Sequence, residues 1–161
     1  MSHLAMELFK TMSGVNVVHV PYRGSAPAAV DLIAGQVQLA MNNIVPTLPH
    51  VKSGRLRALG VSGPLRSPVL PEVPTVAEAG LPGFESLSWY GLWAPAGTSP
   101  ELVGRLQAEV ARAFASPDLK DNWSAQGAEP GGETSDQFAR LVSAEIGKWG
   151  KVVRDNRIAL D

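Results

Sequence analysis

The chain has 161 residues, a net charge of −1 and no cysteine. The lack of Cys excludes disulfides, thiolate nucleophiles and Cys-ligated metal sites, and the balanced charge disfavours a nucleic-acid partner. With 45% hydrophobic and only 18% charged residues, the composition is that of a folded chain rather than a disordered one. The first residues show neither a basic nor an apolar leader, so no signal peptide is expected in this chain.

Helices and strands are predicted to alternate through the first part of the chain. Helical spacing of apolar residues, β-branched runs and the glycines that stop helices mark the boundaries. The predicted elements are a helix from about residue 2 to Gly14, a strand at 15–22, a helix at 25–35, a strand at 37–41, a helix at 46–53 and a strand at 56–62. This alternation is typical of βαβ units and predicts a parallel sheet.

A proline-rich stretch follows at residues 63–83, with one helical turn predicted at 75–79. Two interpretations remain open for this stretch, a long surface connection or a crossing between two lobes. Residues 85–94 then predict a further strand, which Pro95 and Gly97 terminate.

The last third of the chain predicts three helices. Ser99 and Ser116, each followed by Pro, mark the first two starts, and Thr134 with Gln137 forms a capping box for the third. The apolar stripes on these helices are predicted to pack in the core. The stripe of the last helix consists of Phe138, Leu141, Val142, Ile146, Trp149 and Val153.

Motifs for catalysis are not found in the sequence. It contains no phosphate loop, nucleophile elbow or dinucleotide fingerprint, and His3, His19 and His50 lack the spacing of metal ligands. An enzyme would need an acid–base pair that the sequence does not offer. We therefore expect no catalytic residue, no metal site and no cofactor.

A candidate binding site lies where the predicted strands lead into helices. In open α/β sheets, ligands bind outside the carboxyl ends of the strands. The first strand leads into Tyr22-Arg23-Gly24-Ser25 and a helix start, and the second leads into Asn42 and Asn43. Free backbone N–H groups at a helix N-terminus suit a carboxylate, and Gly24 would let it approach the backbone. The helix that begins near Ser2 and His3 would add a second N-terminus.

Several segments resemble the Bug family, the periplasmic substrate-binding receptors of tripartite tricarboxylate transporters. The segments are VPYRGSAP at 20–27, DLIAGQVQ at 31–38, LPHVKSGRLRAL at 48–59, LPEVPTVAEAG at 70–80 and WYGLWAPAGT at 89–98. The resemblance implies an α/β fold of the type II periplasmic binding protein class, with the chain corresponding to its C-terminal half. Residues 1–84 would then form lobe two without its first strand, and residues 85–161 the returning portion of lobe one.

The resemblance also implies a function, the capture of a small organic acid such as a dicarboxylate, tricarboxylate, acidic amino acid or nicotinate-like compound. The membrane subunits of the transporter would be partners, and the location would be periplasmic. Asn42 stands where the family commonly has Asp, which changes the local charge. The positions that match pocket segments of lobe two are Ser2, His3, Tyr22, Arg23, Gly24, Ser25, Ala26, Asn42 and Asn43.

Two alternatives follow from the half-length match. A receptor-like chain of this kind could keep its fold but serve an interaction or sensor role without effective ligand binding. The missing strand would leave a sheet edge open for pairing, so a homodimer or domain-swapped assembly is also expected.

Overall fold

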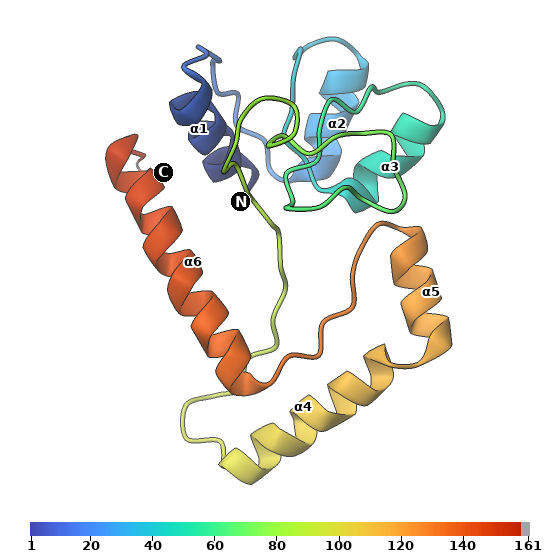
Figure 1. Ribbon diagram of the computed structural model, residues 1–161, viewed down its shortest axis with the longest axis vertical. Coiled ribbons are helices and arrows are strands. Elements are labelled where there is room, and N and C mark those ends of the chain that lie inside the picture. Colours follow the sequence, from blue (N-terminus) through green and yellow to red (C-terminus); the bar gives the residue numbers. More distant parts are fainter. Residues whose placement is uncertain (159–161) are drawn as a thin grey trace.

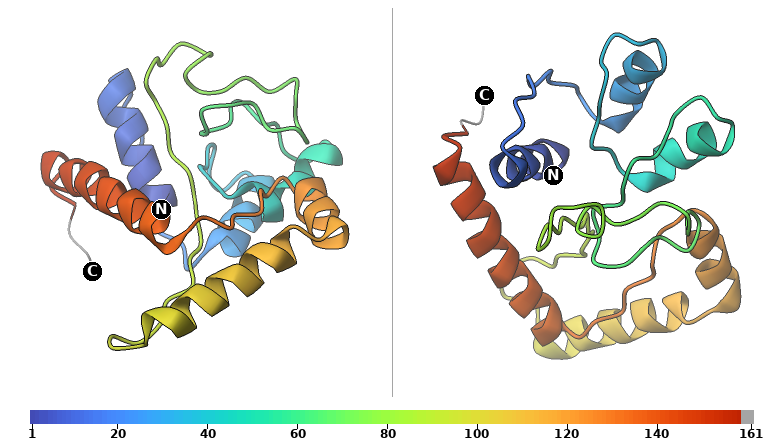
Figure 2. Two further views of the ribbon diagram at one scale, coloured as in Figure 1. Left: turned by 60° about the horizontal axis from the view of Figure 1, so that its bottom comes forward. Right: turned by 45° about the horizontal axis from the view of Figure 1, so that its top comes forward.

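The computed structural model describes residues 1–158, and it is built from helices joined by long loops (Figures 1 and 2). The described helices are α1 (Ser2–Ser13), α2 (Ser25–Ile33), α3 (Ile44–Lys52), α4 (Pro100–Phe114), α5 (Pro117–Ala125) and α6 (Ser135–Asp155). Helices α1, α2 and α3 lie together in one part of the molecule, and α4, α5 and α6 frame the rest. Helix α6 returns to pack beside α1.

The helix ends follow the local signals in the sequence. Gly14 stops α1 in the left-handed region, with φ 72°, where glycine carries no steric penalty. The Ser99 side chain accepts a hydrogen bond from the Leu102 N–H at 3.3 Å at the start of α4. At the start of α6, Thr134 and Gln137 make both bonds of the capping box. These three predicted boundaries are confirmed.

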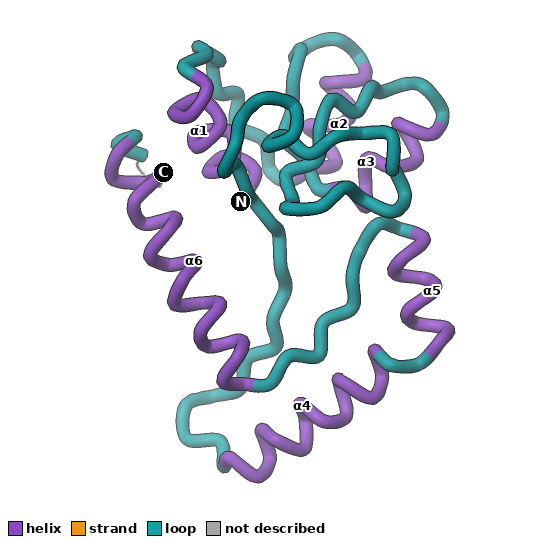
Figure 3. Tube along the Cα trace, viewed as in Figure 1, coloured by secondary structure: helices purple, strands orange, loops and turns teal. Residues whose placement is uncertain are grey.

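The predicted strands do not form a ladder in residues 1–158 of this chain (Figure 3). Segments 15–22, 37–41, 56–62 and 85–94 lie outside the helices, and a single parallel bridge joins Val61 to Thr75. In it, the Val61 N–H donates to the Pro74 carbonyl and the Val76 N–H donates to the Val61 carbonyl, both at 2.9 Å. The paired sheet that was predicted is therefore absent within residues 1–158, because these segments pair only through this bridge and one further bond, from the Ser86 N–H to the Ser62 carbonyl at 2.8 Å.

A small apolar core lies between α3 and the proline-rich segment. Leu48 of α3 packs with Leu70 and Val73, each no more than 6% exposed. The segment at 63–83 is therefore more than a surface connection, because it supplies two of the three buried residues of this core. The helical turn predicted at 75–79 is confirmed by a bond from the Ala79 N–H to the Thr75 carbonyl at 2.9 Å.

Hydrogen bonds of Glu78 stabilise this turn. Its carboxylate accepts the Thr75 N–H at 2.9 Å and the Arg66 Nε–H at 2.7 Å. The Thr75 hydroxyl oxygen in turn accepts the Glu78 N–H at 3.0 Å. The backbone hydrogen bond first, and then Arg66, lower the pKa of the Glu78 carboxyl.

The apolar stripes of the C-terminal helices are only partly buried. Trp149 and Val152 of α6 are each 7% exposed, whereas Ile146 is 68% exposed. Helix α4 has no buried residue among those described. The prediction that these stripes pack in the core is therefore wrong for α4 and for part of α6, because side chains such as Leu106, 53% exposed, stay open to solvent within residues 1–158.

Two long connections lie between the helices α1–α3 and the C-terminal helices or among the latter. Residues 85–94 run from the first part towards α4, and residues 126–134 lead from the end of α5 to the start of α6 (Figure 1). Gly127 lies against the small core, since a Cβ there would stand 2.9 Å from the Val69 side chain and 3.0 Å from that of Ile44.

Candidate functional site

Three helices begin on the same side of the first part of the molecule. The N-terminal ends of α1, α2 and α3 all lie towards segment 85–94 in Figures 1 and 2. An N-terminal helix turn leaves backbone N–H groups free and carries partial positive charge. The predicted pocket segments therefore share one face, although they are far apart in sequence.

Side-chain and backbone groups join the starts of α2 and α3. Gly24 occupies the N-cap position of α2 with φ 108°, a conformation that favours glycine, and the space around its Cα is open. The Asn42 Nδ2–H donates to the Ser25 carbonyl at 3.2 Å. The structure thus brings Gly24, Ser25 and Asn42 together.

Asn43 connects the start of α3 to segment 85–94. It is the N-cap residue of α3, but its side chain makes no capping bond. Instead the Ser88 hydroxyl donates to its Oδ1 at 3.0 Å, and its Nδ2–H donates to the Tyr90 hydroxyl oxygen at 3.4 Å. Sequence reasoning missed Ser88 and Tyr90 as site residues. The available signal was that Tyr90 lies within the family-like stretch at 89–98 and that Ser88 directly precedes it.

Tyr22 and Arg23 behave differently from one another. The Tyr22 hydroxyl donates to Asp31 Oδ2 of α2 at 2.8 Å, which raises the pKa of the tyrosine because the bond favours its neutral form. Arg23 is exposed and makes no ion pair within residues 1–158. Its guanidinium is therefore available to an anion near the start of α2.

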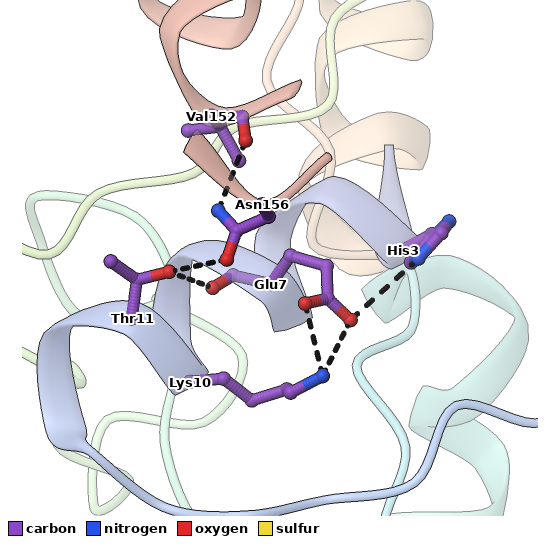
Figure 4. Close-up of polar contacts among 6 residues, drawn as sticks. All are labelled: His3, Glu7, Lys10, Thr11, Val152 and Asn156. Atoms are coloured by element: carbon purple, nitrogen blue, oxygen red, sulfur yellow. Dashed lines mark hydrogen bonds and ion pairs between the residues drawn. The ribbon is translucent and has the colours of Figure 1, made fainter. Parts of the chain in front are cut away.

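The start of α1 carries a histidine pair. The rings of His3 and His19 stack with their centroids 3.8 Å apart and an angle of 10° between planes. Glu7 lies one turn further along α1, where it accepts two hydrogen bonds from Lys10 and stands 3.7 Å from His3 Nε2 (Figure 4). Burial, and then His19, lower the pKa of His3.

A second set of bonds fixes α1 to the C-terminal helix. The Thr11 hydroxyl lies 2.8 Å from the Glu7 carbonyl and 2.8 Å from Asn156 Oδ1, and the Asn156 Nδ2–H donates to the Val152 carbonyl at 3.0 Å (Figure 4). The helix that presents Ser2 and His3 is thus held in place by the end of the chain.

Two of the predicted site residues take no part in the hydrogen bonds around the helix starts. Ser2 is the first residue of α1, and Ala26 lies in the first turn of α2. The Ser2 hydroxyl makes no hydrogen bond among the described residues, and the methyl group of Ala26 cannot make one. Ala26 instead lines a hollow between α2 and α3 whose rim carries His50 and Arg55, 2.9 Å apart at Nδ1 and Nη2.

Acidic side chains and histidines within residues 1–158 do not gather in groups of three that could hold a metal ion. In the same part of the chain, every helix is either too short or too polar to cross a bilayer.

The stability of the folded chain is expected to fall as the pH drops below about 6.5. Since the pKa of His3 is lowered on folding, the unfolded chain protonates first, and stability is lost between the unfolded pKa and the lower folded one. His3→Phe keeps a ring to stack on His19 but does not titrate. Urea midpoints at pH 8 and pH 5.5 should differ less in this variant than in the unchanged chain. An equal pH dependence in both would contradict the prediction.

The comparisons with known proteins agree on one family. Residues 1–158 match the family model described as tripartite tricarboxylate transporter family receptor. A UPF0065 protein in the tcbD-tcbE intergenic region of Pseudomonas sp. (strain P51) is 42% identical, over 97% of this chain and 47% of the relative. A UPF0065 protein in the clcB-clcD intergenic region of Pseudomonas knackmussii is 40% identical, over 97% of this chain and 93% of the relative. Protein BugT of Bordetella pertussis is 39% identical, over 96% and 47%.

Three similar solved structures are of chains about twice as long as this one. "R. palustris Rpa4515 with adipate" is 43% identical with a TM-score of 0.90, over 98% of this chain and 53% of that one. "MatC (Rpa3494) from Rhodopseudomonas palustris with bound malate" is 35% identical with a TM-score of 0.82, over 95% and 53%. Periplasmic binding protein BugD is 31% identical with a TM-score of 0.84, over 96% and 52%. The chain thus spans about half the length of most of these relatives and nearly all of one.

Proposed function

Since this chain belongs to the tripartite tricarboxylate transporter receptor family, we propose that it takes part in capturing a small organic carboxylate for uptake. The observation that carries the proposal is its similarity to two receptors whose solved structures hold adipate and malate, at 43% and 35% identity. The proposed activity is capture without turnover. The partners would be the membrane subunits of the transporter, and the place of action would be the periplasm, where BugD is a binding protein.

The face formed by the three helix starts supports this proposal. A carboxylate at the start of α2 would meet free N–H groups beside Gly24, where no Cβ blocks the approach. Arg23 would supply a positive charge, and Asn43 an amide that already reaches towards Ser88. We propose Tyr22, Ser25, Ala26, Asn42, Ser2 and His3 as further lining residues of the site. Asn42 and Asn43 are uncharged, so they add no repulsion to a carboxylate.

The proposed lobes are residues 1–84 and 85–161. The bonds of Asn43 to Ser88 and Tyr90 support a site between them, because they join the start of α3 to the first residues of the second lobe. If a ligand displaces these bonds, then Ser88 and Tyr90 contribute to the pocket as well.

The second candidate function is an interaction role without effective ligand binding. The half-length match to Rpa4515 favours it, because this chain matches only 53% of the chain that was solved with adipate. In that case the chain would dock to another protein and leave small carboxylates unbound.

Calorimetry with adipate, malate, citrate, glutamate and nicotinate tests the first function. Binding of at least one carboxylate is expected, weaker than in a complete receptor. Asn43→Ala should weaken that binding by about tenfold, or about 1.4 kcal/mol. Asn122→Ala is the matched control, since Asn122 is an exposed amide on α5 whose hydrogen bonds are to Gln126, and it should bind as before. No heat with any of the five compounds would favour the interaction role.

A further inference from the structure

The chain exposes far more surface than a compact protein of its mass. Its accessible surface is 11114 Å², whereas a compact monomer of 17.0 kDa exposes about 7,700 Å². The excess of about 3,400 Å² exceeds the roughly 800 Å² that each partner buries in an ordinary stable complex. Only the large interfaces of permanently associated partners bury so much surface on one partner.

Part of this surface comes from backbone that lacks a partner. Among the described residues, no backbone-to-backbone hydrogen bond is donated by segments 16–22, 37–41 or 57–60. Runs of free N–H and C=O groups of this kind are a template for a strand from another chain. We call segments 15–22, 37–41 and 56–60 together the strand-edge surface.

The side chains of the strand-edge surface are apolar and open to solvent. Val18 is 83% exposed, Leu59 60%, Val20 49% and Leu39 41%. Val and Leu at these exposures stand on segments whose pattern is that of buried strands. Covering these side chains with a partner would therefore be favourable, and a partner strand would replace the hydrogen bonds that the backbone makes with water.

We propose that the strand-edge surface docks the portion of a family receptor that this chain does not match, and that this portion adds strands to it. The TM-score of 0.90 over 98% of this chain means that the chain already has the arrangement found within a receptor about twice as long. The open segments are then complementary to the remaining part of such a receptor. A second copy of this chain is less suitable, because it presents the same unpaired segments and no ready-made partner for them.

The test is to refold the 161-residue chain together with the unmatched portion of Rpa4515, without any carboxylate present. Size-exclusion chromatography with light scattering should show a one-to-one complex. Hydrogen exchange should show at least tenfold slower exchange of the amides of 16–22 and 37–41 in the complex than in the chain alone. Adipate added afterwards is a separate readout: a complex that forms but does not bind it counts against the proposed ligand and leaves the docking surface standing.

Val18→Lys should weaken the complex by at least tenfold, since it places a charge on the strand-edge surface. Its side chain is almost fully exposed, so the free chain should fold as before. Leu65→Lys is the control, because Leu65 is 80% exposed but lies in the proline-rich segment outside that surface. The proposal is overturned if no complex forms, if both variants behave alike, or if the chain alone forms a homodimer that protects the same amides.

Discussion

Replacing Phe84 with alanine is expected to lower the free energy of unfolding by about 3–5 kcal/mol. Phe84 is 2% exposed and is one of the two most deeply buried side chains among the described residues. Its ring meets that of Phe9 edge to face, with the centroids 6.0 Å apart. The substitution would leave a cavity between α1 and the point where segment 85–94 begins, and it would remove this aromatic contact.

Urea denaturation followed by circular dichroism measures the loss. Because so few side chains of this chain are buried, a loss of this size could consume most of its stability, and the variant is expected to be largely unfolded at 37 °C. Leu65→Ala is the control, since an exposed side chain of this kind should change stability by no more than about 0.5 kcal/mol. A loss below about 1 kcal/mol in the Phe84 variant would show that the ring is not packed as described.

The helices could be predicted from the sequence because their signals are local. Gly14 needs only its own backbone to stop α1, and the bonds of Thr134 and Gln137 span three residues. The resemblance to the Bug family and the binding-protein fold class, read from motifs along the chain, are likewise confirmed by the family match and by solved relatives such as BugD.

Pairing and burial could not be predicted in the same way, because they depend on neighbours that are distant in sequence. The β-branched run at 15–22 has the composition of a buried strand, yet Val18 lies open to solvent. Conversely, prolines at 63–83 suggested an irregular surface stretch, but Leu70 and Val73 there pack on α3. The composition of a segment indicates whether it can form a strand, but it forms one only where a neighbouring strand pairs with it.

The candidate site shows the same division. Gly24 was expected at a helix start and Asn42 at the end of a strand, and the bond from Asn42 to the Ser25 carbonyl joins the two predicted segments. The partners of Asn43 were not predicted, since Ser88 and Tyr90 are 45 and 47 residues away. No periodic pattern links positions so far apart, and only the path of segment 85–94 brings them together.

Gly91→Ala is expected to cost about 1–3 kcal/mol, because an added methyl group would overpack an aromatic cluster. A Cβ at Gly91 would stand 2.2 Å from Phe138 Cζ, far inside van der Waals contact. The Phe138 ring cannot easily retreat, since it packs between Trp89 and Trp93 at centroid distances of 5.4 and 5.3 Å. The methyl group would therefore push segment 85–94 away from the start of α6.

Gly104→Ala is the matched control for this substitution. A Cβ at Gly104 would meet no atom within 4 Å, and an alanine within α4 should stabilise the chain by up to about 1 kcal/mol. Urea denaturation followed by tryptophan fluorescence measures both variants, because Trp89 and Trp93 report on the cluster directly. If the two alanines shift the midpoint in the same direction, the cluster is not packed against Gly91. If they shift it in opposite directions, the segment that carries Ser88 and Tyr90 is positioned by α6, and Gly91→Ala should also weaken any carboxylate binding that depends on Asn43.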